Sequence, residues 1–402
     1  MRRRLGSFVF FALSSALLSA QGDKGDIEKR IASIAALIQD SKLDRAVAEA
    51  SELVAAHAFE IQAQMAAFQT NIQAYQQDPS GSESARRLDQ ALRHLNLARR
   101  IDPDDYEAWE ASVSFWDPNR IDLKPHDPEA EKVLREAQGY FTEGDLDKAA
   151  EALSKVVNLE PSYAPAYLHL GEVHMTRQEP EQAIKFFRIA TEKDPKDAAG
   201  FLLLAIAYGS MEKSQEAVAN LLNSLKADPG FPTAWEQLLQ LDMEGKKVER
   251  LALKFPKGVL WAVEREVKEA SGQDLADVAA LTHPAWKAYI ATRIRWRSSE
   301  FSKRYPDMKV YRYTFGEESA AINDMLAAWN EAKAADSKAS DSLLDHWLAA
   351  SQASSLDAAI FTELFLEEFR PEFNAWKNRN PNKFEEYFYK FVLPAVSAQE
   401  NK

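Results

Sequence analysis

The chain has 402 residues, a formal net charge of −13 and no cysteine. The lack of cysteine excludes disulfides, thiolate zinc sites, iron–sulfur clusters and a cysteine nucleophile. The acidic balance disfavours nucleic-acid binding, because affinity for a duplex comes largely from lysine and arginine side chains that neutralise phosphates. With 46% hydrophobic and 28% charged residues, the composition is typical of an ordered protein with a folded core.

The first twenty residues have the pattern of a secretory signal peptide. Three arginines precede an apolar stretch from Leu5 to Leu18, and the small residue Ala20 marks the expected cleavage site. This stretch has about 14 residues, fewer than the ~20 that a membrane-spanning helix needs. We therefore expect residues 1–20 to be removed during export to the periplasm or the external medium. The alternative is a retained anchor, since Leu18 stands where cleavage prefers a small side chain.

Residues 21–116 are predicted to form an N-terminal helical region with degenerate repeats. The stretch from Leu43 to Ala46 has the pattern of a turn into a second helix, and residues 46–77 contain neither proline nor glycine, which predicts one unusually long helix. The prolines at positions 118, 125 and 128 interrupt the helical pattern and indicate a connector over residues 117–129.

The middle of the chain repeats with a period of 34 residues. Three prolines mark this period, each directly after an acidic residue: Pro161, Pro195 and Pro229. Twelve positions before them stand the small residues Ala149, Ala183 and Ala217, and eight positions before them stand Leu153, Phe187 and Leu221. Small residues suit a close helix crossing, and large ones fill the adjacent gap. The pattern predicts pairs of antiparallel helices, each pair ended by its proline.

These positions resemble the tetratricopeptide repeat family. The stretch Ala166–Ala190 followed by Asp194-Pro195 carries nearly every signature position of that family. The usual turn between the two helices occurs as Gly144-Asp145, whereas the next two units replace these residues. The resemblance covers residues 130–256 and implies an all-α solenoid of helix pairs that binds protein partners. A fourth unit begins at Pro232 and is expected to cap the array, because Pro256 cuts its second helix at 246–255.

The resemblance also implies a binding surface. In this family, certain positions of each first helix tend to face the concave side. In this sequence those positions hold Leu134, Gln138, Phe141, Leu168, Glu172, Met175, Leu202, Ile206, Glu236 and Gln240. Family members that clamp a terminal carboxylate carry lysine, arginine and asparagine there, so this chain is expected to bind an extended or helical peptide with apolar anchors instead. The alternative is that Leu134, Leu168 and Leu202 only pack between units.

Residues 257–402 are predicted to form a C-terminal, aromatic-rich helical domain that resembles no recognised family. Helical patterns recur at 259–272, 284–304, 317–335, 341–353, 356–369 and 381–392. Residues 308–315 alternate like a strand, but without a partner strand they are expected to form an extended connector.

A basic and aromatic segment in this domain is the second candidate site. Its main members are Arg293, Arg295, Trp296, Arg297 and Arg304. In an acidic protein, such a patch suits an anionic polymer, a lipid headgroup or an acidic partner. The alternative is internal neutralisation by four later glutamates, Glu363, Glu367, Glu368 and Glu372.

The sequence lacks the common catalytic signatures. It has no glycine-rich phosphate loop, no G-x-S-x-G and no H-E-x-x-H. His169 and His174 are five residues apart, so they do not share a helix face and do not indicate a metal site. We expect a non-catalytic, exported scaffold or adaptor for protein or peptide partners, with no cofactor, metal or nucleic acid. The alternatives are an envelope-associated enzyme with its site in 257–402, or a subunit of an envelope assembly; the partner and the oligomeric state stay open.

Overall fold

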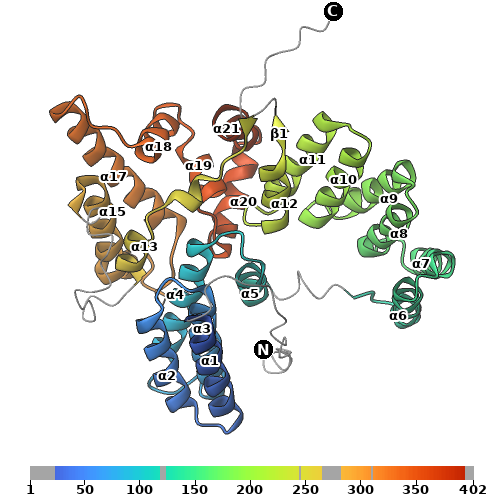
Figure 1. The fold of residues 1–402 in the computed structure, drawn as a ribbon, viewed down its shortest axis with the longest axis horizontal. Coiled ribbons are helices and arrows are strands. Elements are labelled where there is room, and N and C mark those ends of the chain that lie inside the picture. Colours follow the sequence, from blue (N-terminus) through green and yellow to red (C-terminus); the bar gives the residue numbers. More distant parts are fainter. Residues whose placement is uncertain (1–22, 118–123, 244–245, 265–281, 309–310, 394–402) are drawn as a thin grey trace, which may run out of the picture.

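The chain is built almost entirely of α-helices, as the computed structural model in Figure 1 shows. The structure describes residues 23–117, 124–243, 246–264, 282–308 and 311–393. The expected signal peptide at 1–20 lies outside these ranges. Among the helices within them, not one combines the length and the apolar character that crossing a bilayer requires. The predicted all-α fold class is confirmed.

The N-terminal region consists of two helical hairpins and one further helix. They are α1 (Asp23–Gln39), α2 (Leu43–Ala56), α3 (Ile61–Gln77), α4 (Ser84–Ile101) and α5 (Tyr106–Trp116). The single long helix predicted over 46–77 is wrong, because the chain leaves α2 at His57 and re-enters a helix at Ile61. The buried side chain of Gln64 donates from Nε2 to the carbonyl of Ala58 at 2.7 Å. This hydrogen bond gives the Ala58 carbonyl a donor, which it would otherwise have had from the backbone of a continuous helix.

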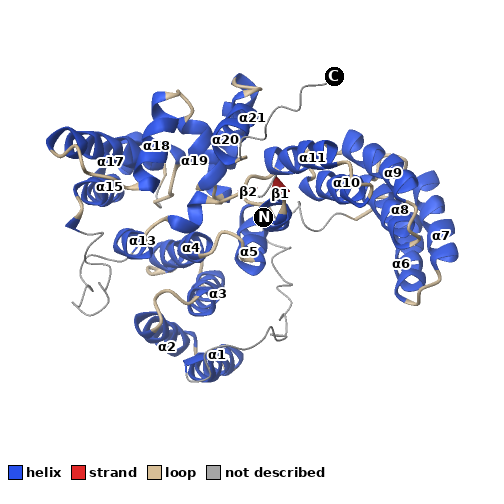
Figure 2. Ribbon diagram, turned by 45° about the horizontal axis from the view of Figure 1, so that its top comes forward, coloured by secondary structure: helices blue, strands red, loops and turns tan. Residues whose placement is uncertain are grey.

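The repeat array follows as three stacked helix pairs and the first helix of a fourth. Its helices are α6 (Pro128–Thr142), α7 (Leu146–Leu159), α8 (Ala164–Thr176), α9 (Pro180–Lys193), α10 (Ala198–Ser210), α11 (Ser214–Ala227) and α12 (Pro232–Gln240). In Figure 2 the pairs follow a curve, with the first helices α6, α8 and α10 on its inner side and the second helices on its outer side.

The turns inside the three pairs share one backbone conformation. Gly144, Gln178 and Glu212 stand 34 residues apart, and their φ angles are 79°, 62° and 59°. Glycine adopts this left-handed conformation without steric cost, whereas other residues lose about 1 kcal/mol. The second and third pairs therefore have the same turn as the first pair, although they lack its Gly-Asp sequence. Ser41, between α1 and α2, has a φ of 59° as well, so the first hairpin of the chain turns in the same way.

Close helix crossings hold each pair together. The side chain of Ala183 in α9 is fully buried, and so is that of Phe187 one turn later. A Cβ atom placed on Gly171 in α8 would lie 2.3 Å from Cε1 of Phe187. Non-bonded carbon atoms do not come this close to each other. Only a glycine at position 171 therefore allows α8 to lie so near the ring of Phe187.

The fourth unit lacks the second helix that the sequence predicts over 246–255. After α12, the chain forms an antiparallel hairpin of two short strands, β1 (Asp242–Met243) and β2 (Lys246–Lys247), each two residues long. The 3₁₀ turn η1 (Leu251–Lys254) follows. C-terminal helices occupy the neighbouring space, where Phe388 packs on Trp235 of α12 at a ring-centroid distance of 5.7 Å.

The C-terminal segment forms short helices with irregular joints. The elements are α13 (Lys257–Glu264), α15 (Pro284–Arg295), the π-helical turn η2 (Trp296–Glu300), α16 (Phe301–Arg304), α17 (Phe315–Ala335), α18 (Ser342–Gln352), α19 (Leu356–Glu363), the 3₁₀ turn η3 (Glu367–Phe369), α20 (Arg370–Arg379), α21 (Lys383–Tyr387) and the π-helical turn η4 (Phe388–Val392). Residues 311–314 have no regular structure, so the described end of the segment 308–315 is a connector. The sequence patterns missed α20.

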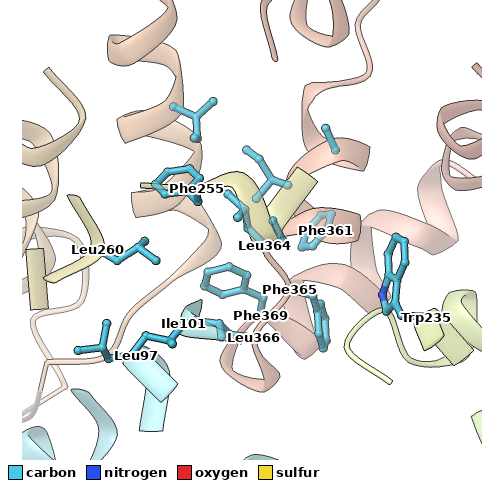
Figure 3. Packing of buried hydrophobic residues seen from close by; sticks show 14 of the residues in the cluster. Leu97, Ile101, Trp235, Phe255, Leu260, Phe361, Leu364, Phe365, Leu366 and Phe369 are labelled. Carbon is cyan, nitrogen blue, oxygen red and sulfur yellow. The ribbon is translucent and has the colours of Figure 1, made fainter. Parts of the chain in front are cut away.

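One hydrophobic core joins the three parts of the chain. Figure 3 shows Leu97 and Ile101 of α4 and Trp235 of α12 around a group of C-terminal side chains that includes Phe365 and Phe369. All of these side chains are buried. The C-terminal helices therefore share their core with the N-terminal region and with the last unit of the array.

Gly171→Ala tests the close crossing of α8 and α9. We expect the substitution to lower the free energy of unfolding by about 1–3 kcal/mol, because the added methyl group overlaps the ring of Phe187. The control is Gly139→Ala in α6, where an added Cβ meets no atom within 4 Å. That variant should gain about 0.5–1 kcal/mol from helix propensity. Chemical denaturation measures both, and equal effects of the two variants would contradict the packing of α8 on Phe187.

Candidate protein-binding site

A buried carboxylate anchors the last unit of the array to both flanking regions. Asp228, the acidic residue before the third repeat proline, has a fully buried side chain. Its Oδ1 accepts a hydrogen bond from Nη2 of Arg370 in α20 at 2.8 Å, and its Oδ2 accepts one from Nε1 of Trp109 in α5 at 3.0 Å. The Asp-Pro position of the third unit thus links the array to α5 and α20.

Further buried arginines extend this junction. Arg99 of α4 donates to the carbonyl of Gly230 at 3.0 Å, next to the start of α12. Arg250 is paired with Asp104, and its guanidinium lies 4.4 Å from the ring centroid of Trp235. Together with Arg100, Arg293 and Arg370, these residues are called the arginine seam below. Through it, the end of the array is held in a fixed position relative to α4 and α5.

The seam continues into the C-terminal helices as a buried ionic cluster. Nε of Arg293 lies 2.6 Å from Glu317, and its Nη1 lies 3.4 Å from Glu318. Nη2 of Arg100 lies 3.2 Å from the same Glu318 carboxylate. Burial alone would raise the pKa of Glu318, but the two guanidinium groups hold the pKa below its usual value. The Glu318 carboxylate is therefore charged while fully buried.

Asp228→Asn tests the anchor. Replacing the carboxylate by a neutral amide removes the charge that Arg370 faces, so the free energy of unfolding should fall by about 3 kcal/mol. Asp194, the equivalent residue one unit earlier, lies closer to the surface and accepts only a local bond from the amide of Lys196. The control Asp194→Asn should change stability by less than about 0.5 kcal/mol. Thermal denaturation of both variants measures the difference, and a similar loss in each would disprove the anchoring role.

The concave-face residues predicted from the sequence divide into three groups in the structure. Leu134 and Leu202 are 7% and 6% exposed and pack inside the array. Phe141 and Ile206 are 40% and 38% exposed. Leu168, Glu172 and Met175 are half-buried, whereas Gln138, Glu236 and Gln240 are exposed. Apolar side chains of α6, α8 and α10 are thus at least partly exposed, and their position on the inner side of the curve stays a prediction.

A hollow of about 370 Å³ lies where α12 meets the start of α5. Its lining consists of Asp104, Tyr106, Pro232, Thr233, Glu236, Leu239 and Gln240. Glu236 and Gln240 were predicted as concave-face residues, but Asp104 and Tyr106 were not. The repeat register did not reveal these two residues, because they precede the connector in a region where the pattern is degenerate. The one available signal was the aromatic start of the helix, Tyr106 to Trp116.

Comparison with known families agrees with this architecture. The sequence model of the tetratricopeptide repeat matches residues 140–206, which run from the end of α6 into α10. This part of the chain is therefore a tetratricopeptide repeat array. Domains of this kind mediate protein–protein interactions and typically act as scaffolds without catalytic activity.

Among characterised proteins, the DnaJ homolog subfamily C member 7 homolog of Schizosaccharomyces pombe (strain 972 / ATCC 24843) is 23% identical over 164 residues. The alignment covers 40% of this chain and 32% of that protein, so the chain spans about a third of its relative's length.

Two solved structures are similar to this chain at low identity. A MamA structure is 15% identical, covers 50% of this chain and 91% of its own, and has a TM-score of 0.23. The tetratricopeptide domain of P58(IPK) is 13% identical, covers 82% of this chain and 98% of its own, and has a TM-score of 0.27. These low scores carry no information about function.

The basic and aromatic segment lies against the core of the C-terminal helices. Arg293 and Trp296 are buried, and Arg297 is paired with Asp89 of α4 at 2.9 Å. Arg295 is half-exposed and lies 3.1 Å from Asp324, and the guanidinium of Arg304 covers the ring of Trp296 at 4.6 Å. Buried side chains are out of reach of an external polymer, so only part of the segment is accessible.

The carboxylates that neutralise this segment differ from those the sequence indicated. Arg293 pairs with Glu317 and Glu318, whereas Glu367 binds Arg370 and Glu363 accepts the backbone amides of Leu251 and Ala252. Burial raises the pKa of Glu363 to about 7.

The histidines of the array are engaged in local contacts. Nδ1 of His169 lies 2.8 Å from Glu172, and Nδ1 of His174 lies 2.7 Å from Glu179. Within the part of the chain that the structure describes, no three histidine or acidic side chains gather where they would hold a metal ion.

Proposed function

We propose that this protein is an exported, non-catalytic scaffold that binds a polypeptide along the inner side of its tetratricopeptide array. The observation that supports this proposal is the exposure of Phe141 and Ile206 on first helices, where an array in water gains nothing from apolar side chains. Between them, half-buried Leu168 and Met175 continue an apolar lining from one unit to the next.

The chemistry of this lining suits apolar anchor residues. Burial of an exposed phenylalanine or isoleucine by a partner contributes on the order of 1–2 kcal/mol, at about 25 cal/mol per Å² of apolar surface. Methionine adapts to partners of different shape, because its side chain is unbranched and flexible. Two polar members of the lining, Glu172 and Glu236, are acidic and would repel the terminal carboxylate that other arrays clamp.

The arrangement of polar groups in the C-terminal helices supports a non-catalytic role. The charged side chains that are densest there, Arg293, Glu317 and Glu318, are fully buried and bonded to one another. Such groups stabilise one packed arrangement and have no access to a substrate.

Substitution of the two exposed anchors tests the proposed surface. Phe141→Glu combined with Ile206→Glu should weaken binding roughly 30-fold, equivalent to ~2 kcal/mol, because each carboxylate would be buried against an apolar partner surface. The control is Leu159→Glu, which changes a 43% exposed leucine at the end of the outer helix α7. Leu202 is unsuitable for this test, since it packs inside the array.

The measurement is quantitative affinity capture from the envelope fraction of the source cells, with the wild-type chain, the double variant and the control. Partners that the control retains and the double variant loses would support the inner surface. Equal capture by all three proteins would rule that surface out.

Export rests on the sequence pattern of residues 1–20 and needs a direct test. We expect the native protein, recovered from the periplasm or the medium, to begin at Gln21 when its N-terminus is sequenced. Leu13→Arg should block export and leave the precursor inside the cell, because the charge interrupts the apolar stretch. A membrane-bound protein that still begins at Met1 would indicate a retained anchor instead.

A further inference from the structure

The hollow between α5 and α12 lies beside the last helix of the array. At the repeat period of 34 residues, Glu236 of α12 corresponds to Leu202 of α10, and Gln240 corresponds to the exposed Ile206. A polypeptide that follows the lining beyond Ile206 therefore arrives at this hollow. Its volume of about 370 Å³ is of the size that proteins use to hold a side chain or a small ligand.

The negative charge of the hollow is only partly neutralised by the protein itself. Asp104 is paired with Arg250, so its charge is compensated. The carboxylate of Glu236 has no ion-pair partner among the described residues, and its Oε1 accepts a bond from Nε2 of Gln240 at 3.3 Å. The exposed carboxylate of Glu236 thus has an oxygen that is able to accept a hydrogen bond from a ligand.

An aromatic ring with a fixed position forms one wall. Tyr106 is 51% exposed, and its ring packs on Trp109 at a centroid distance of 5.1 Å. Trp109 in turn packs on Phe231 at 5.1 Å and donates to the buried carboxylate of Asp228. Trp109, which is itself packed and hydrogen-bonded, therefore supports the tyrosine ring. Burial and the nearby carboxylate of Glu110 raise the pKa of Tyr106, so the phenol stays neutral at physiological pH.

We propose that this hollow receives a positively charged side chain, arginine or lysine, of the polypeptide bound along the array. A carboxylate together with an accessible aromatic face is the combination that recognises a guanidinium or ammonium group. Pro232 and Leu239 supply apolar surface for the methylene stem of such a side chain. This inference rests on the proposed peptide-binding function and adds the chemistry of one anchor to it.

The test selects ligands from random sequences, so it does not require that the natural partner be identified first. A phage-displayed library of random dodecapeptides is panned against the full chain, and enriched peptides are synthesised. We expect apolar residues together with at least one arginine or lysine at a common position. Replacement of that residue by citrulline or glutamine should weaken binding to the wild-type chain about tenfold, as measured by isothermal titration calorimetry.

Variants then assign the effect to the hollow. Glu236→Gln combined with Tyr106→Leu should bind the cationic peptide and its neutral analogue equally, with unchanged thermal stability. The control Glu181→Gln removes an exposed carboxylate from the outer helix α9 and should keep the preference for the cationic peptide.

The outcomes separate this inference from the function on which it rests. Enriched peptides that bind through Phe141 and Ile206 but carry no cationic residue would overturn the inference and leave the proposed function intact. A cationic preference that survives the Glu236 and Tyr106 substitutions would also overturn it. A library without any peptide sensitive to Phe141 and Ile206 would overturn the proposed function itself.

Discussion

The junction of the array with α5 and α20 depends on the buried carboxylate of Asp228. It accepts hydrogen bonds from Arg370 of α20, from Trp109 of α5 and from the amide of Gly230 at the start of α12. Desolvation of a buried ion pair offsets much of its attraction, so such a group contributes more to a specific arrangement than to stability. Because three elements far apart in the sequence meet at this carboxylate, the angle between the array and α5 follows from it, and so does the hollow beside them.

The two ends of the array have different environments. At the α12 end, the missing second helix is compensated by C-terminal side chains such as Phe388, which cover Trp235. At the α6 end, the outward surface carries the exposed side chains of Lys132, Arg135 and Glu136. A polar outer surface of this kind is what a terminal repeat needs in order to stay soluble. The array is thus anchored to the other helices at its α12 end.

Features that depend on contacts within one repeat were predictable from the sequence, whereas those that depend on distant partners were not. The small residue at Ala183, the ring of Phe187 and the prolines determine each pair locally, and the structure has these pairs in register. The break at His57 has no local signal, since the side chain that satisfies Ala58 comes from Gln64 in the next helix.

The same limit applies to the candidate sites. Arg293 has glutamates available at many later positions, and only the packing of α15 on α17 selects Glu317 and Glu318 over Glu363. The repeat register identified Glu236 and Gln240, because they lie at family positions of a recognisable first helix. It did not identify Tyr106, whose place beside α12 follows from the contacts of Trp109 with Phe231 and Asp228.

The distribution of groups along the inner side gives the proposed ligand a direction. The apolar side chains Phe141 and Ile206 stand on α6 and α10, whereas the uncompensated carboxylate of Glu236 stands on α12. A helical peptide with two apolar residues and one cationic residue matches this order better in one orientation, because reversal would take the cation away from a carboxylate and place an apolar group against Glu236. Electrostatic mismatch of this kind contributes to specificity more than to affinity. The arginine seam holds α12, which carries Glu236, against α4 and α5. The contacts that anchor the array would therefore also position the carboxylate that orients the proposed ligand.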